Sequence, residues 1–163
     1  MDRVNEIWKH PLYQKYYARI EELEQNRVFC RHQMPHLLDV ARIAYIRNLE
    51  DDMGFAKDVV YAAAVLHDIG KALQYEARIP HELAGVDIAE QILADLPAEA
   101  AYTTDEKRMI LTAVKGHRRL REDPEPLEKL LYESEKASRM CFACPAEAQC
   151  DWSREKKNME IKV

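Results

Sequence analysis

The chain has 163 residues, of which 47% are hydrophobic and 33% are charged, so its composition is that of one folded domain and excludes an intrinsically disordered protein. Only 4 glycines are present, which disfavours a β-sandwich with many tight turns. The net charge of -5 gives no general attraction for nucleic acid or for an anionic membrane. A small anionic substrate is still compatible with this charge, because a bound metal supplies positive charge locally.

Residues 1–6 lack the apolar segment of a signal peptide, and the longest apolar run, residues 59–66, is too short to span a bilayer. We therefore expect a cytoplasmic protein with no membrane partner. In that compartment the 4 cysteines are expected to be reduced thiols or metal ligands rather than disulfides. The sequence does not fix the oligomeric state, and a homo-oligomer is compatible with it.

Hydrophobic spacing predicts helices along most of the chain and no alternating strand. In chain order the predicted helices span residues 6–25 with a break at Pro11, 35–51, 56–67, 80–96, 104–115 and 126–140. Pro35 suits the first turn of a helix and Gly54 suits a stop after one. Residues 59–66 are apolar on every side, which is typical of a helix buried at the centre of a fold. The sequence therefore predicts an all-α, single-domain helical bundle with a central buried helix over residues 56–68.

The apolar segment ends in Leu66-His67-Asp68-Ile69-Gly70-Lys71, which delivers His67 and Asp68 into the interior. A buried aspartate needs a cation or several hydrogen-bond donors to offset its lost hydration. A divalent metal supplies this, and a His beside an Asp suits a borderline or hard cation. An Asp that only caps a loop explains the dipeptide equally well.

Four other segments also carry a metal-type side chain on the apolar side of a predicted helix: His36, His81, His117 and Glu135. Each of these residues alone is better explained as an ordinary core or surface residue. Five segments that all point such a residue inward are much harder to explain in that way, and together they favour a metal site. Glu133 is a rival to Glu135, but it falls on the opposite side of its helix.

Three motifs carry a family resemblance: His36-x-x-x-Val40-Ala41, Leu66-His67-Asp68-Ile69-Gly70-Lys71 and Glu135-Lys136-x-Ser138-Arg139. In this order they resemble the HD-domain superfamily of metal-dependent phosphohydrolases, whose signature is His, then His-Asp, then a distant Asp. The resemblance covers residues 29–139. It implies that His36, His67, Asp68 and Glu135 surround a divalent metal ion, with Fe, Mn, Zn, Ni and Mg as candidates. Glu135 departs from the usual Asp by one methylene group.

His81-x-x-x-Gly85 and Gly116-His117 resemble the positions that hold a second metal in a subset of this superfamily. Members with this six-ligand set often carry two irons, and some cleave dinucleoside polyphosphates or phosphodiesters. The resemblance therefore implies one or two divalent ions, with Asp68 as the bridge between two.

The resemblance implies hydrolysis of a phosphomonoester or phosphodiester, with a nucleotide or a related small phosphorylated molecule as substrate. A metal lowers the pKa of bound water from 15.7 to about 7 in the best cases, which supplies the nucleophile. Asp68 and Lys71 are the candidate catalytic residues, although Lys71 reads equally well as a solvated loop lysine. The candidate contacts to the substrate phosphate are Arg31, His32, Lys71 and Arg139. His32 precedes the helix that carries His36 and is not expected to bind the metal.

A different function class is compatible with the same residues. A non-catalytic HD-type protein could bind a nucleotide, or it could sense metal or redox state through its cysteines. The complete ligand set favours the enzyme, whereas the glutamate at position 135 and the cysteine-rich C-terminal tail favour the sensor.

The tail over residues 141–163 contains Cys141-x-x-Cys144 and Cys150, a spacing that suits thiolates converging on one metal. The remaining cysteine, Cys30, precedes the segment that carries His36. If His36 meets Glu135, Cys30 is brought close to the tail. We therefore predict a site of four cysteines that holds zinc or an iron–sulfur cluster, with free thiols in a flexible tail as the alternative.

This cysteine site assumes a particular domain organisation. Residues 1–140 are expected to form the HD-type domain, and the tail is expected to pack on that same domain. The last part of the tail, residues 151–163, is charged and is expected to be peripheral apart from Trp152.

Overall fold

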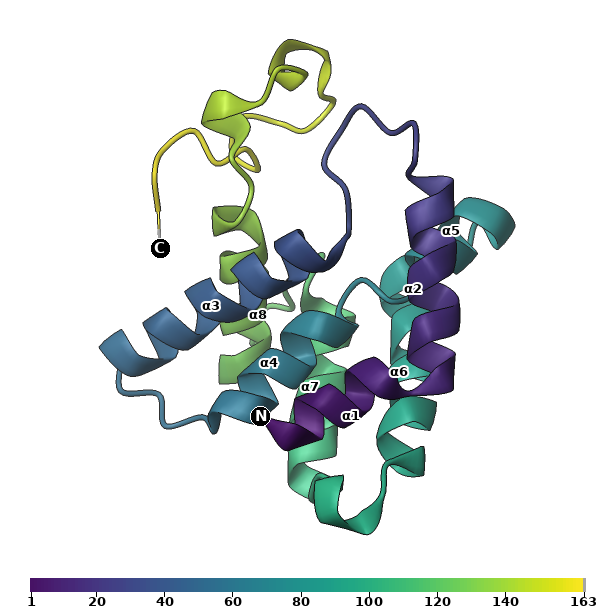
Figure 1. Ribbon diagram of the computed structural model, residues 1–163. Coiled ribbons are helices and arrows are strands. Elements are labelled where there is room, and N and C mark those ends of the chain that lie inside the picture. The colour runs from purple at the N-terminus through teal and green to yellow at the C-terminus, as the bar shows by residue number, and fades with distance from the viewer. Residues whose placement is uncertain (163) are drawn as a thin grey trace.

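The structure, a computed structural model, describes residues 1–162, and this part of the chain contains no β-strand. Its α-helices are α1 (Asp2–Lys9), α2 (Pro11–Leu23), α3 (Met34–Glu50), α4 (Lys57–Leu66), α5 (Lys71–Ala77), α6 (His81–Asp95), α7 (Thr104–Gly116) and α8 (Pro126–Ala137) (Figure 1). Short 3-10 helices follow α6 and α8: η1 (Ala98–Ala100), η2 (Cys141–Ala143) and η3 (Glu147–Gln149). The all-α prediction is confirmed.

Helix α4 lies at the centre of the bundle and packs against α1, α3, α7 and α8. Its residues Ala62, Ala63 and Ala64 expose none of their surface. Small side chains on successive positions let neighbouring helices approach α4 from several directions, while each buried apolar group adds to the core. The predicted central helix is therefore confirmed, and His67 and Asp68 lie in the turn that follows it.

Three features of the helices differ from the sequence-based expectation. Helix α1 begins at Asp2 rather than at residue 6. Helix α5 was not predicted, because its seven residues are too few to show a clear apolar period. Helix α8 ends at Ala137, before the expected end at residue 140. There the Nδ2 of Asn158 donates a hydrogen bond of 2.8 Å to the carbonyl oxygen of Ala137, so a residue from the tail satisfies a free carbonyl at this helix end.

The tail runs beside the loop that joins α2 to α3, at one end of the bundle (Figure 1). Asn158 is only 6% exposed, and its carbonyl oxygen accepts a hydrogen bond of 3.1 Å from the backbone N–H of Phe142. The expectation that residues 151–163 are peripheral is therefore wrong at Asn158, because its amide caps α8. Val163 lies outside the described residues. None of the helices in residues 1–162 combines the length and the apolar character that crossing a membrane requires.

Candidate metal centre

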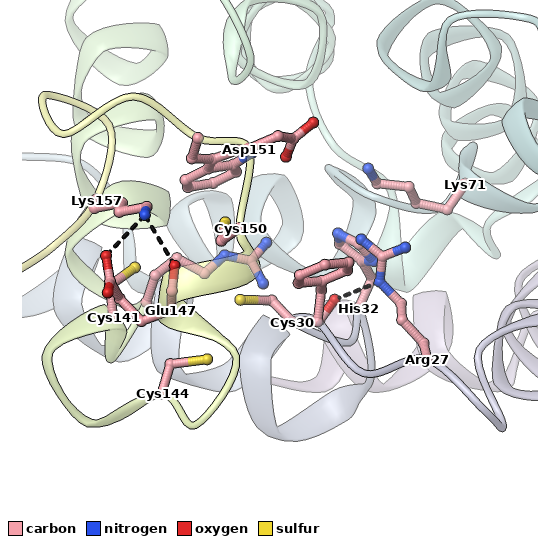
Figure 2. Close-up of a pocket in the computed structure, with 13 residues that line it drawn as sticks. Arg27, Cys30, His32, Lys71, Cys141, Cys144, Glu147, Cys150, Asp151 and Lys157 are labelled. Atoms are coloured by element: carbon pink, nitrogen blue, oxygen red, sulfur yellow. Dashed lines mark hydrogen bonds and ion pairs between the residues drawn. The ribbon is translucent and has the colours of Figure 1, made fainter.

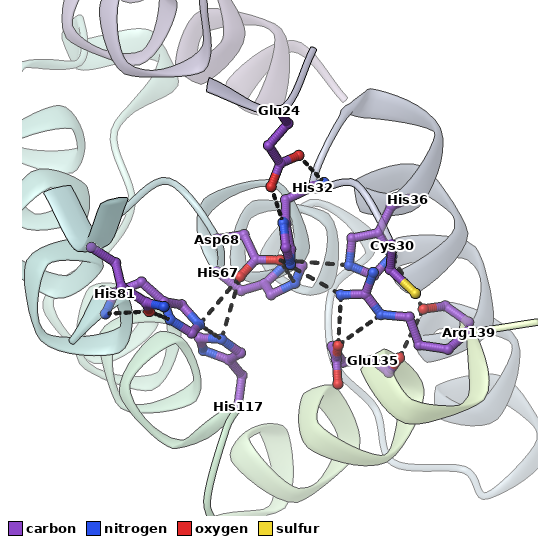
Figure 3. Close-up of polar contacts among 12 residues, drawn as sticks. Glu24, Cys30, His32, His36, His67, Asp68, His81, His117, Glu135 and Arg139 are labelled. Atoms are coloured by element: carbon purple, nitrogen blue, oxygen red, sulfur yellow. Dashed lines mark hydrogen bonds and ion pairs between the residues drawn. The ribbon is translucent and has the colours of Figure 1, made fainter. Parts of the chain in front are cut away.

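Five chain segments bring one end each to the same place, beside the turn that follows α4. The candidate ligands occupy the first turn of α3, the turn after α4, the first position of α6, the residue after α7 and the last turn of α8: His36, His67, Asp68, His81, His117 and Glu135. Figure 3 shows Asp68 at the centre of this group, with the imidazoles on both sides of its carboxylate. The residues that the sequence singled out separately are therefore neighbours in space.

Gly70 explains why α6 can approach the turn after α4 so closely. A Cβ atom at position 70 would lie 2.2 Å from the carbonyl oxygen of His81 and 2.5 Å from the backbone nitrogen of Gly85. Only a residue without a side chain fits there, since backbone atoms cannot move aside cheaply. This contact places His81, at the start of α6, next to Asp68.

The two carboxylate oxygens of Asp68 face different pairs of histidines. Its Oδ2 lies 2.9 Å from the Nε2 of His67 and 3.6 Å from the Nε2 of His36. Its Oδ1 lies 3.4 Å from the Nε2 of His81 and 3.6 Å from the Nε2 of His117. Asp68 thus forms two ligand groups that share one carboxylate, the first with His36 and His67 and the second with His81 and His117.

The other nitrogen of each imidazole is already used by the protein. The Nδ1 of His67 donates to the carbonyl oxygen of Ala64 at 2.6 Å, and the Nδ1 of His117 donates to that of Val114 at 2.6 Å. The Nδ1 of His81 donates to the side-chain oxygen of Gln74. In each neutral ring the Nε2 atom therefore carries the lone pair, and these lone pairs face Asp68.

His36 is oriented in the same way through Ser138. The hydroxyl of Ser138 donates to the backbone carbonyl oxygen of Glu135 at 2.8 Å, so it accepts from the Nδ1 of His36 at 3.3 Å. The Nε2 lone pair of His36 then also faces Asp68. A hydrogen bond that fixes the distal nitrogen of a histidine is the usual support for a metal-binding imidazole.

Lone pairs that face one another at these distances repel unless a cation lies between them. The Nε2 atoms of His81 and His117 are 2.9 Å apart. The Nε2 atoms of His36 and His67 and the Oδ2 of Asp68 are buried without a hydrogen-bond partner in the described chain. Buried polar atoms are rarely left unpaired, so these atoms fit the donor set of a divalent metal ion.

Burial keeps His36 and His81 in the neutral form that can bind a metal. Desolvation lowers the pKa of His36 to about 3, and the positive charge of Arg139 lowers it further in the same direction. Desolvation lowers the pKa of His81 to about 2, although the carboxylate of Asp68 acts against this shift. Asp68 shifts to lower pKa as well, although burial raises the pKa of a carboxyl group: electrostatic interactions with surrounding groups, in the order His67, His32 and Lys71, outweigh burial and hold this pKa well below its ordinary value.

Glu135 is placed near the other candidates but is held by cations of the protein. The Nη2 and Nε atoms of Arg139 donate to its Oε1 at 2.8 and 3.0 Å, and Lys136 pairs with its Oε2. The Nη2 of Arg139 also lies 4.0 Å from the Oδ2 of Asp68. Within residues 1–162, neither group of convergent ligand atoms includes Glu135. The structure therefore brings five of the six candidate ligands together and leaves Glu135 paired with Arg139.

The candidate substrate contacts fall on two cavities beside the centre. His32, Lys71 and Arg139 line a cavity of about 130 Å³, whereas Arg31 and Arg139 line a second one of about 390 Å³. The Nη2 of Arg31 donates a hydrogen bond of 3.0 Å to the carbonyl oxygen of Gln25. The backbone N–H of Lys71 donates to the carbonyl oxygen of Asp68 at 2.9 Å, whereas its side-chain ammonium forms no hydrogen bond or ion pair with a described residue and is available to a ligand.

Two residues that the sequence alone did not single out support His32: Glu24 and Tyr75. Glu24 is fully buried. Its carboxylate accepts hydrogen bonds from the backbone N–H and the Nδ1 of His32, and a third one, of 2.6 Å, from the hydroxyl of Tyr75. The Nε2 of His32 then lies 4.0 Å from the Oδ2 of Asp68. Arg27, which lines the smaller cavity, was also missed. A glutamate in a polar helical segment shows no sign of burial in the sequence, because its hydrogen-bond partners come from distant positions.

All four cysteines line the smaller cavity together with Lys71 and Arg139. Figure 2 shows Cys30 near the middle of this cavity, with its sulfur toward the tail, and Cys141, Cys144 and Cys150 on the tail side. The fold therefore brings Cys30 to the same cavity as the other three cysteines, which are far from it in sequence. All four are free thiols in the structure.

Comparison with known proteins agrees with this geometry. A protein of Clostridium beijerinckii, described only as uncharacterized, is 41% identical over 161 residues, which is 99% of both chains. Ribonuclease Y of Chloroflexus aurantiacus is 31% identical over 94 residues, or 56% of this chain and 18% of that protein. Ribonuclease Y of Syntrophomonas wolfei is 32% identical over 88 residues, or 53% of this chain and 16% of that protein.

This chain thus spans less than a fifth of the ribonuclease Y proteins that it matches, so the likeness concerns one domain of them. No solved structure matches the chain significantly. The family model for the HD domain matches residues 35–142, which contain all six candidate ligands. The chain therefore belongs to the HD-domain superfamily of metal-dependent phosphohydrolases.

Proposed function

We propose that this protein hydrolyses a phosphate ester of a small molecule of the nucleotide type, with two divalent metal ions bridged by Asp68. The observation that carries the proposal is the convergence of four Nε2 lone pairs on the two oxygens of one buried carboxylate. His36 and His67 would hold the first ion, and His81 and His117 the second. Four of these donors are imidazoles, which favours a transition metal such as iron or manganese over Mg²⁺.

Each ion would have only three ligand atoms from these groups, which leaves positions open for water and substrate. When bound, such ions supply an activated water nucleophile and offset negative charge on the phosphoryl oxygens. We propose Glu135 as a further ligand of the first ion, which requires its carboxylate to exchange Arg139 for the metal. This exchange would release the guanidinium of Arg139 toward a substrate phosphate.

The protein's own cations support the binding of a phosphate beside the metal centre. Lys71, Arg27 and Arg139 line the smaller cavity, and Arg31 lines the neighbouring one. Arginine and lysine side chains are the usual partners of phosphate oxygens. Lys71 and His32 would orient the phosphoryl group, while Phe29, which lines both cavities, offers a ring for a base to stack on.

The name ribonuclease Y indicates that the partial relatives act on RNA. We propose a small substrate for this chain instead, because its net charge of -5 gives no general attraction for a polyanion and its cations are gathered at two small cavities.

A direct assay tests the proposal. The protein is loaded with Mn²⁺ or Fe²⁺ without oxygen and mixed with p-nitrophenyl phosphate, bis(p-nitrophenyl) phosphate and a panel of nucleotides, including dinucleoside polyphosphates. We expect metal-dependent hydrolysis that is lost in Asp68→Asn. Lys71→Met should raise KM roughly tenfold, since a charged hydrogen bond contributes about 1.5–3 kcal/mol. The exposed Lys129→Met on α8 is the matched control and should leave KM unchanged.

The non-catalytic alternative has one observation in its favour, the pairing of Glu135 with Arg139 rather than with the ligand groups. A metal-loaded protein that binds a nucleotide tightly but hydrolyses none of the panel would support this alternative and overturn the proposed activity.

A further inference from the structure

We propose that Cys30, Cys141, Cys144 and Cys150 bind an iron–sulfur cluster that joins the C-terminal tail to the loop before α3. This site is separate from the His/Asp centre, whose candidate ligands include no cysteine. The four thiols come from two parts of the chain that are 111 residues apart (141 minus 30) and line one cavity (Figure 2).

The sulfurs are not gathered as closely as a single zinc ion requires. Four thiolates on one zinc ion lie about 3.8 Å apart, as tetrahedral geometry with Zn–S bonds of about 2.3 Å requires. Within residues 1–162, no three cysteine sulfurs lie within 4.8 Å of one another. In an iron–sulfur cluster no three cysteines bind the same iron, so the sulfurs stand wider apart.

The charges around the cavity suit an anionic occupant. A cluster bound by four thiolates carries net negative charge, and the charged residues that line the cavity are four cations and two carboxylates: Arg27, Lys71, Arg139, Lys157, Glu147 and Asp151. Lys157 lies at the tail end, where its Nζ also pairs with Glu147 at 2.7 Å. Arg27, Lys71 and His32 lie toward the opposite end (Figure 2), where the Nε2 of His32 is 4.0 Å from the Oδ2 of Asp68. The cluster and a substrate phosphate would therefore occupy different ends of this cavity.

The backbone that presents the thiols is held by its own hydrogen bonds. The N–H of Cys144 donates to the carbonyl oxygen of Cys141 at 3.2 Å, in the turn of η2. The N–H of Cys150 donates to the carbonyl oxygen of Glu147 at 3.1 Å, in η3. On the other side of the cavity, the Nε of Arg27 donates to the carbonyl oxygen of Cys30 at 2.8 Å.

The tail has too little buried apolar surface to hold these turns by packing. Phe142 is 41% exposed and Ile161 88% exposed, and among the tail's described residues Ala146 and Cys141 are the buried apolar ones. Segments without an apolar core of their own are commonly held by a disulfide or a metal site, and all four cysteines here are free thiols. A cluster coordinated by Cys30 and the three tail cysteines would hold the tail on the domain.

The test uses the full chain purified without oxygen and measures iron, zinc, acid-labile sulfide and visible absorption. Asp68→Ala removes the metal of the His/Asp centre, so in this variant we expect iron and acid-labile sulfide in about equal amounts and a brown colour. Cys30→Ser should lose most of the sulfide, as Cys144→Ser should, while circular dichroism reports whether each variant folds. Ser153→Ala, an exposed tail position, is the matched control and should keep the full sulfide content.

Three results would overturn the proposal: one zinc ion per chain without sulfide, full sulfide in folded Cys30→Ser, or four thiols that react with an alkylating reagent equally fast in the native protein. If the cysteine variants do not fold, the metal and sulfide content of the wild-type and Asp68→Ala proteins still decides the question. Each of these results concerns the cysteines only, so none of them bears on the proposed hydrolase activity.

Discussion

Arg139 holds Glu135 through two hydrogen bonds to the same oxygen, at 2.8 and 3.0 Å, while its Nη2 lies 4.0 Å from the Oδ2 of Asp68. Arg139 is 4% exposed and both carboxylates are buried with it. One guanidinium thus compensates two buried negative charges, which is the role that a metal ion would also fill. The stability of the protein without metal should therefore depend on Arg139.

Arg139→Gln should destabilise the metal-free protein by about 3–5 kcal/mol, because it leaves the carboxylate of Glu135 buried with less compensation. Added Mn²⁺ should recover part of this loss, so the metal should raise the Tm of the variant more than that of the wild type. Thermal unfolding with and without Mn²⁺ measures both effects. Arg108→Gln, which removes an exposed pair with Glu125, is the control. Equal Tm shifts in the variant and the wild type would argue against a shared role of Arg139 and the metal.

Substitutions of Glu135 test whether this residue binds the metal or only orients Arg139. If it binds the first ion, Glu135→Gln should lower the affinity for Mn²⁺ by about tenfold or more, since even supporting groups of metal ligands contribute that much. Glu135→Asp, which keeps the charge, should retain most of the affinity. Isothermal titration calorimetry measures the Mn²⁺ affinity of both variants. An unchanged affinity in Glu135→Gln would show that Glu135 pairs only with Arg139 and does not bind the metal.

Gly70 gives a prediction on stability. Gly70→Ala should lower the free energy of unfolding by roughly 3 kcal/mol, because the new methyl group would overlap backbone atoms of His81 and Gly85. Gly85→Ala, on the other side of the same contact, is the control: its Cβ would meet no atom closer than 3.5 Å and should cost little. Urea denaturation compares the two variants. A Gly70→Ala protein as stable as the wild type would contradict the close approach of α6 to the turn after α4.

Arg3 on α1 joins α1 to α4 and α7, and we expect the stability that these contacts contribute to depend on pH. Its guanidinium donates to Asp58 on α4 at 2.6 Å and to Glu106 on α7 at 2.8 and 2.9 Å. These hydrogen bonds are the main reason that the pKa of Asp58 and that of Glu106 are lowered. Arg3→Gln should cost about 1 kcal/mol near neutral pH, given that the three side chains are partly exposed.

The sign of the pH dependence follows from the direction of these shifts. A carboxyl group whose pKa is lowered by folding adds stability above its unfolded pKa, about 3.9 for Asp and 4.3 for Glu, and loses it as the pH falls through the folded pKa. The difference between wild type and Arg3→Gln should therefore be constant from pH 7 to about 5 and shrink below about 4. Denaturation curves measure this difference in the free energy of unfolding from pH 7 to below pH 4. A difference that grows in acid would show that Arg3 does not lower the pKa of these carboxyl groups.

The sequence predicted the part of the site that depends on local pattern. The apolar run before His67 predicted both the buried helix and the delivery of Asp68 to the interior, because a helix without a polar face must be surrounded. The roles of Glu24 and Asn158 could not be predicted, since both are polar residues in polar segments and their burial depends on distant partners. The pairing of Glu135 with Arg139 was open to prediction, because residues four apart lie on the same face of a helix.

The most direct test of the central claim is an anomalous difference map from crystals of the full chain grown with Mn²⁺. Two ions held by Asp68 should give two peaks about 3.5–4 Å apart, one beside each oxygen of Asp68, as in other two-metal sites. His36 and His67 should border one peak, and His81 and His117 the other. A fully loaded protein with no peak within bonding distance of Asp68 would show that Asp68 is not a metal ligand.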